Sequence, residues 1–218
     1  MKKFASFFAV FLFITLFAVA SEAGDRNIPV EVAQLTDSLK KQFAPDRRVA
    51  LLDVDYSFSD KNVMLRGVTT SAEAKNALLK ELARKGYAVM DCLELLPDVK
   101  GLEGKTCGII NVSVANMRVA PDFSSEMMTQ SLMGMPVRVL QRDGWVRIQT
   151  PDNYIAWVHR VGVHPVTEEE MAAWNKAEKI VVTAHYGFVY SEPNQTSQTV
   201  SDVVAGNRLK WEGSKGAF

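Results

Sequence analysis

The spacing of apolar residues in the first hundred positions predicts a small α+β domain. Between 32 and 43 they recur every three or four residues, as on one face of a helix. In 50–58 they alternate with more polar neighbours, as in a half-buried strand. The turn SDKN leads into a second predicted strand, VMLRGVT, and YAVMDCLELL predicts a third. With a second helix before that strand, the predicted order over 25–100 is helix, strand, strand, helix, strand.

Capping and turn residues define the second helix and the end of this domain. Thr70 and Glu73 have capping-box spacing ahead of an alanine- and leucine-rich run. Gly86 follows that run and can close the helix in a left-handed conformation. The connector PDVKGLEGKTCG, rich in Pro, Gly and charge, then marks a domain boundary.

After the connector, short apolar runs separated by turns predict an all-β region. IINVSVANMRV, APDFSSE and PVRVLQRDGWVRIQTPDNYIAWVH show no helical period, which favours a compact barrel over 107–165. Thr167 and Glu170 have capping-box spacing in TEEEMAAWNKAE, which predicts a short connecting helix over 166–178.

Residues 179–218 are similar to the beginning of 107–165, which indicates a tandem repeat. Ile110, Val114 and Val119 align with Ile180, Ala184 and Val189 at a separation of 70, whereas Gly134 and Val137 align with Gly206 and Leu209 at 72. This change predicts a two-residue insertion between them. The first copy continues into WVRIQTPDNYIAWV, and the chain ends where the second would do so. We therefore expect an incomplete second barrel in a fragment of a longer polypeptide, with a natural degenerate repeat as the alternative.

The first 23 residues have the layout of a secretory signal peptide. Two lysines precede an apolar run over 4–20, and small residues follow at Ala20 and Ala23. The run is short for a membrane span, which needs about 20 residues, and no cysteine follows it to carry a lipid. We expect export to the periplasm or the extracellular space without a stable membrane anchor. A retained anchor is the alternative.

Charge and cysteine content narrow the class of protein further. The chain has 25 basic and 25 acidic residues, so it lacks the basic excess expected of a nucleic-acid partner. Cys92 and Cys107 in an exported chain favour a disulfide. The alternative, a nucleophilic cysteine served by His159, His164 or His185, has no recognisable local motif.

Several short motifs occur together between Ser125 and Val158. They are Ser125-Glu126, Thr129-Gln130, Gly134, Gly144-Trp145, Pro151-Asp152-Asn153-Tyr154 and Trp157-Val158. Together they resemble the bacterial SH3 (SH3b) domain found upstream of NlpC-type cell-wall cysteine peptidases. The resemblance implies SH3-like barrels behind the α+β domain, which is itself similar in pattern to BON-type domains. Asn153 and Ala156 stand beside a tight turn, at positions where the family usually has Gly.

The same resemblance implies a function. Members of the family are γ-D-glutamyl-L-diamino-acid endopeptidases, which split peptidoglycan stem peptides with a papain-like domain located after the SH3b modules. This chain would then hold no catalytic residue, and its partners would be stem peptides and a downstream peptidase domain of the same polypeptide. A stand-alone SH3b module that binds cell wall or protein without enzymatic activity is the alternative.

By resemblance, Glu126 and Tyr154 bind the substrate. The Glu126 carboxylate would pair with the free amino terminus of an L-Ala-γ-D-Glu peptide, and Tyr154 would add a directed hydroxyl and a ring contact. The alternatives are a solvated loop residue for Glu126 and a packing aromatic for Tyr154.

Other residues with potential chemistry have simpler interpretations. Trp145 and Trp157 could stack on sugars, but we expect them to fill the barrel core or its rim. The methionine cluster is expected to serve packing, and it consists of Met127, Met128, Met133 and Met135. His159 and His164 lack the spacing and acidic partners of a zinc motif. We therefore predict neither a metal site nor a cofactor.

Overall fold

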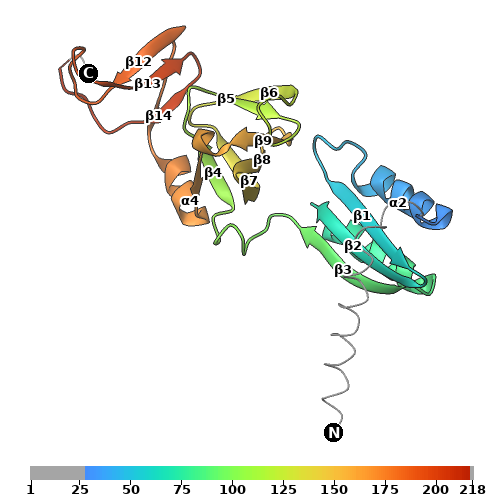
Figure 1. Cartoon of the computed structure of the whole chain (residues 1–218). Helices are drawn as coiled ribbons and strands as arrows, with labels where there is room; N and C mark the ends of the chain where they lie inside the picture. Colours follow the sequence, from blue (N-terminus) through green and yellow to red (C-terminus); the bar gives the residue numbers. More distant parts are fainter. Residues whose placement is uncertain (1–27, 217–218) are drawn as a thin grey trace. The chain divides into compact units, whose positions relative to one another are not determined.

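A computed structural model describes residues 28–216, so the predicted signal peptide lies outside the described residues. The chain divides into two compact units, with the boundary between Leu95 and Leu96 (Figure 1). The secondary structure is mostly β, with few helices. Within 28–216, no helix is both long enough and apolar enough to cross a membrane.

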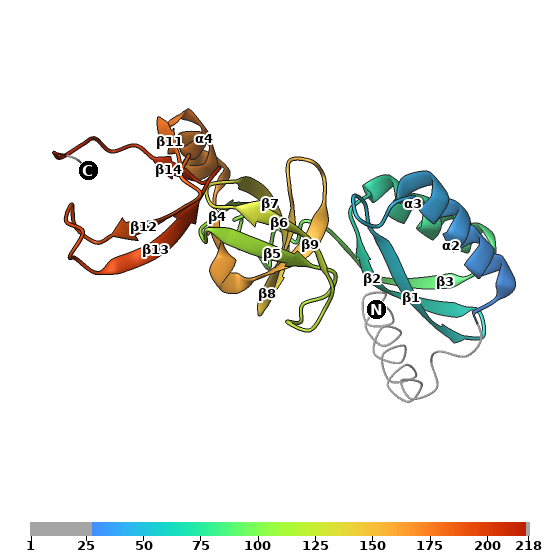
Figure 2. The same ribbon diagram turned by 90° about the horizontal axis from the view of Figure 1, so that it is seen from above.

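The first unit is a three-stranded sheet with two helices on one side (Figure 2). In chain order its elements are α2 (Val30–Phe43), β1 (Leu52–Ser59), β2 (Asn62–Thr69), α3 (Ala72–Arg84) and β3 (Ala88–Leu95). β2 is central, antiparallel to β1 and parallel to β3. Val32, Leu65 and Leu78 are fully buried between helices and sheet. The element order agrees with the sequence pattern, because the helical and alternating periods are both long here.

Helix α3 begins one residue later than the sequence suggested. Ser71 is the N-cap, and its Oγ accepts a hydrogen bond of 3.0 Å from the Ala74 backbone N–H. The predicted cap, Thr70, instead accepts a bond of 2.9 Å from the Leu51 backbone N–H. Gly86 follows the helix with φ 82°, as its predicted role requires.

The second unit is built around a seven-stranded sheet with the order β10-β4-β7-β8-β9-β5-β6. The strands are β4 (Cys107–Ile110), β5 (Val114–Arg118), β6 (Met127–Leu132), β7 (Pro136–Asp143), β8 (Trp145–Gln149), β9 (Ile155–His159) and β10 (Val163–Val166), with a 3-10 turn, η1 (Arg160–Gly162), before β10. The core contains fully buried residues from several strands, including Ile110, Met117, Val139 and Ile148.

A short helix and two small sheets follow. They comprise α4 (Glu168–Lys176), β11 (Lys179–Val181), β12 (Tyr186–Tyr190), β13 (Thr199–Val204) and β14 (Arg208–Lys210). The capping box of Thr167 and Glu170 is present at the start of α4, as predicted. β11 pairs with β14, and β12 pairs with β13. The interpretation of 179–218 as an interrupted barrel stays a prediction.

The two repeats are separated by 72 residues throughout, so the predicted separation of 70 for their first strands is wrong. The Gly134 N–H donates to Ile110 O, and the Gly206 N–H donates to Val182 O, both at 2.8 Å. In the same register Ile110, Val114 and Val119 correspond to Val182, Tyr186 and Ser191, not to Ile180, Ala184 and Val189. The predicted two-residue insertion therefore does not exist. The separation of 70 matched the residue types better, because it pairs Ile110 with Ile180 and Val119 with Val189.

A buried asparagine links the second repeat to the first barrel. The Asn207 side chain is fully buried, where its amide donates 2.9 Å to Ser113 O and its oxygen accepts 2.9 Å from the Val204 N–H. The Arg208 N–H donates to Met133 O, and the Ser113 hydroxyl donates 2.7 Å to Asp202. This small set of polar contacts holds β13 and β14 against the barrel.

We predict that Asn207→Ala lowers the free energy of local opening of β13 and β14 by about 1–3 kcal/mol, because two buried hydrogen bonds are lost. Hydrogen exchange of the backbone amides in 199–210 measures this change. Asn175→Ala, at an exposed position on α4, is the control and should change it by less than about 0.5 kcal/mol. Equal protection in the two variants would contradict a linking role for Asn207.

Candidate functional site

The loop between β5 and β6 is fixed by its own side chains. Asp122 accepts hydrogen bonds from the Ser124 backbone N–H at 2.7 Å and the Ser124 hydroxyl at 2.6 Å. These bonds lower the pKa of the Asp122 carboxyl. Ser125 Oγ accepts 2.9 Å from the Ala120 N–H, and Arg118 Nη1 donates to Ser125 O. The loop therefore has a defined shape although most of its surface is exposed.

Glu126 and Tyr154 lie at the same end of the barrel. Glu126 directly precedes β6, and its carbonyl accepts a bond of 3.0 Å from the Val119 N–H, just past the end of β5. Tyr154 directly precedes β9, which runs antiparallel to β5 and pairs with it through Arg118 and Trp157. The end of β5 and the starts of β6 and β9 therefore bring both predicted residues to one edge.

The environments of the two residues differ. The Glu126 side chain is exposed, and no basic residue within 28–216 forms an ion pair with it. Tyr154 is half-buried, and its carbonyl accepts bonds from the Thr150 N–H at 3.0 Å and the Thr150 hydroxyl at 3.2 Å. Asn153 has φ 70°, a left-handed conformation that Gly adopts readily and that Asn also tolerates. The turn that carries Tyr154 is thus formed without a glycine.

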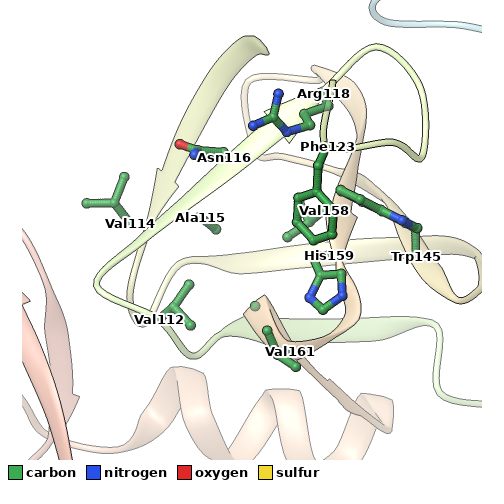
Figure 3. A pocket seen from close by; sticks show the side chains of 11 residues that line it. Val112, Val114, Ala115, Asn116, Arg118, Phe123, Trp145, Val158, His159 and Val161 are labelled. Atoms are coloured by element: carbon green, nitrogen blue, oxygen red, sulfur yellow. The ribbon is translucent and has the colours of Figure 1, made fainter. Parts of the chain in front are cut away.

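A groove lies between β5 and the end of β9, on the other side of the Arg118–Trp157 pair from Tyr154. The two strands pair at Arg118 and Trp157, and beyond that pair residues of both strands line this groove of about 210 Å³ (Figure 3). Its floor and sides are mainly aliphatic. The lining residues are Val112, Val114, Ala115, Asn116, Arg118, Phe123, Trp145, Val158, His159, Val161 and Gly162.

Three aromatic rings from different elements form one wall of the groove. Phe123 comes from the fixed loop, Trp145 from β8 and His159 from β9. Their ring centroids are 4.9 Å apart for Phe123 and Trp145, 5.0 Å for Phe123 and His159, and 5.3 Å for Trp145 and His159. Figure 3 shows the Phe123 ring next to the His159 ring, with Asn116 and Arg118 on the neighbouring strand. Phe123 is nevertheless 66% exposed, so one side of its ring faces solvent.

The two tryptophans have distinct places. Neither belongs to the barrel core, because both are half-buried on outward-facing positions of β8 and β9. Trp145 lines the groove, whereas Trp157 lies under the Arg147 guanidinium at 5.1 Å. Only Trp145 is therefore placed to contact a ligand in this groove.

The methionines mostly serve packing, as predicted. Met133 is buried, and Met128 and Met135 pack against the barrel core, but Met127 is 49% exposed. Within 28–216, no group of three or more His, Cys, Asp or Glu side chains is arranged as a metal site.

The predicted disulfide is not formed. Cys92 is an exposed free thiol on β3 of the first unit, and Cys107 is a half-buried free thiol on β4 of the second. Burial, with a smaller contribution from Glu168, raises the pKa of the Cys107 thiol. A raised pKa reduces the thiolate fraction, which is the reactive form.

Comparisons with known proteins identify the class of the barrel. Residues 117–161 match the family model of the bacterial dipeptidyl-peptidase SH3 domain. The barrel therefore contains a bacterial SH3 domain of this type, and the match covers Glu126, Tyr154 and most of the groove. No curated protein matches the chain.

Two solved structures are similar to part of the chain. One is an NlpC/P60 endopeptidase from Photobacterium damselae subsp. piscicida, with a TM-score of 0.42 and 14% identity over 54% of this chain and 29% of that chain. The other is an NlpC/P60 family protein from Bacillus cereus ATCC 10987, with a TM-score of 0.41 and 19% identity over 50% of this chain and 48% of that chain. The matched region spans less than half of either protein.

Most of the residues that line the groove could not be predicted from the sequence. Arg118, Phe123 and His159 were not identified as neighbours, because their proximity depends on the pairing of β5 with β9. The one available signal was Phe123 itself, a large apolar residue inside a polar Pro-Asp turn.

We predict that native protein without reductant titrates as two free thiols per chain. At neutral pH, Cys107 should be alkylated more slowly than the exposed Cys92, and its rate should rise as the pH approaches the raised pKa. Glu168→Gln should lower that pKa and speed alkylation of Cys107 modestly, without affecting Cys92. Mass spectrometry of the alkylated peptides measures both rates, and a Cys92–Cys107 disulfide peptide would contradict the prediction.

Proposed function

We propose that this chain is the substrate-recognition region of an exported cell-wall hydrolase. In this proposal its first barrel binds short peptidoglycan stem peptides by their free amino terminus and presents them to a downstream cysteine peptidase domain. The observation that carries the proposal is the position of Glu126 and Tyr154 at one edge of a bacterial SH3 domain. The match of 117–161 to the SH3 domain of bacterial dipeptidyl-peptidases supports a peptidase as the enzyme.

The charge of Glu126 suits an ammonium ligand. Because no basic side chain within 28–216 pairs with this carboxylate, an incoming ammonium does not have to displace one. The hydrogen bond formed would be charge-assisted, and partial exclusion of water by the ligand would strengthen it. Glu126 is attached to a fixed loop, so little conformational freedom is lost when the peptide binds.

The same contact selects among peptides. A stem peptide still linked to its glycan has an amide at this position, so it offers no positive charge to Glu126. Binding it would desolvate the carboxylate without an ionic partner, which costs free energy. Cleaved peptides with a free amine would therefore be preferred over intact cell wall.

We predict that an L-Ala-γ-D-Glu peptide with a free amine and an amidated C-terminus binds the full chain. Amine acetylation and Glu126→Gln should each weaken binding by roughly tenfold or more, which corresponds to the loss of one charge-assisted hydrogen bond. Isothermal titration calorimetry at low salt measures the dissociation constants.

Asp152→Asn is the matched control. It removes a carboxylate from the exposed turn before Tyr154 and should leave the affinity within about twofold of the original. Equal affinities of the free and acetylated peptides for the original protein would overturn the role of Glu126, as would equal losses in the two variants.

A further inference from the structure

We propose that the groove between β5 and β9 is a second ligand site, which binds an apolar residue that carries a carboxylate, such as the C-terminal residue of a peptide. The site uses Arg118 for the carboxylate and the rings of Phe123, Trp145 and His159 for the apolar part. It requires neither an ammonium group on the ligand nor Glu126. The proposal therefore does not rest on the function proposed above.

The charges around the groove favour an anion. Arg118 supplies a positive charge there, and none of the described lining residues is acidic. The carboxylate of Asp122 lies near enough for Arg118 to contribute to its lowered pKa, but that contribution ranks below the two hydrogen bonds from Ser124. Asp122 is thus engaged within its own loop and does not line the groove.

Arg118 is held in place and still has donors to offer. Its Nη1 donates to Ser125 O, which fixes the guanidinium against the loop. A guanidinium has five N–H donors, and its planar fork matches the two oxygens of a carboxylate. Arg118 is half-buried, so a carboxylate there would interact with it more strongly than in open water. Asn116 lines the same side, where its side-chain oxygen accepts 2.9 Å from the Gln130 amide.

The apolar walls determine which anion fits. Inorganic anions would gain nothing from the aliphatic floor or from the rings of Phe123 and Trp145. A ligand side chain placed there would cover the exposed face of Phe123 and remove apolar surface from water, which contributes about 25 cal/mol per Å² before the costs of association. An apolar body joined to a carboxylate uses both halves of the groove.

The second repeat shows that the loop conformation does not depend on the side chains of Asn116, Arg118 and Phe123. Its loop repeats the same hydrogen bonds 72 residues later, with Asn194 accepting 3.0 Å from the Thr196 N–H and Ser197 Oγ accepting from the Glu192 N–H. Yet the positions equivalent to Asn116, Arg118 and Phe123 hold Phe188, Tyr190 and Gln195. The loop therefore forms without the basic and aromatic residues of the groove, so its conformation does not explain why they are present.

The experiment uses the N-acetylated tripeptide acetyl-Ala-Ala-Leu as either the free carboxylate or the amide. Acetylation removes the amine that the Glu126 site requires, so only the groove is probed. By calorimetry on the full chain, the carboxylate form should bind, and the amide should bind at least tenfold more weakly. Inorganic phosphate alone should not compete at equal concentration.

Two variants test the carboxylate-binding part and the apolar part of the groove independently. Arg118→Gln should weaken the carboxylate peptide about tenfold and leave the amide nearly unchanged, whereas Phe123→Ala should weaken both forms. Because Phe123 is mostly exposed, its replacement leaves the fold intact. Arg142→Gln removes an exposed charge of β7 that does not line the groove, so it is the control and should have no effect.

Spectroscopy locates the ligand. In the two-dimensional NMR spectrum, the indole N–H signal of Trp145 should shift on titration, and Glu126→Gln should not alter that shift. Equal affinity for carboxylate and amide would overturn the proposal, as would absence of binding or an unchanged Trp145 signal. None of these results bears on the amine-dependent test of Glu126, so the two proposals can fail separately.

Discussion

The pairing of Arg118 with Trp157 is the contact on which the geometry of the candidate site depends. It joins β5 to β9 at one position only. On one side of the pair, the strand ends bring Glu126 and Tyr154 to a common edge. On the other side lies the groove that Phe123, Trp145 and His159 line. One pairing thus positions both candidate surfaces.

Local sequence rules predicted the elements well wherever one period extends over a whole element. Helix α2 and the alternating strand β1 are examples, because each buries one continuous face. The predictions were wrong where two neighbouring residues can play the same role. Thr70 and Ser71 are both good capping residues, and only the hydrogen bond from the Leu51 N–H to Thr70 determines which one caps the helix. That partner lies 19 residues earlier and cannot be inferred from the cap itself.

In the candidate site, too, some residues could be predicted from local sequence and others could not. Glu126 and Tyr154 were identified through short motifs, and a motif remains visible in one sequence. Arg118 and His159 have no such motif, since they become neighbours of Phe123 only through strand register and loop shape. The disulfide prediction failed for a related reason: the composition of an exported chain favours a cysteine pair, but the two cysteines belong to separately folded units.

The two repeats show how one backbone can carry different chemistry. Hydrogen bonds of the loop and the first two strand pairs recur at a separation of 72 residues, and both β5 and β12 have a bulge at the equivalent step. On the outward face, however, Val114, Asn116 and Arg118 are replaced by Tyr186, Phe188 and Tyr190, whose neighbouring rings lie 5.1 and 6.5 Å apart. Tyr186 and Phe188 are 59% and 50% exposed, so packing within the described residues covers neither ring. The backbone contacts require only small polar residues in the turn and alternation in the strands, which leaves the outward positions free to diverge. The second repeat therefore preserves the strand pairs and the loop on the β5 side of the groove, but not the charge of Arg118.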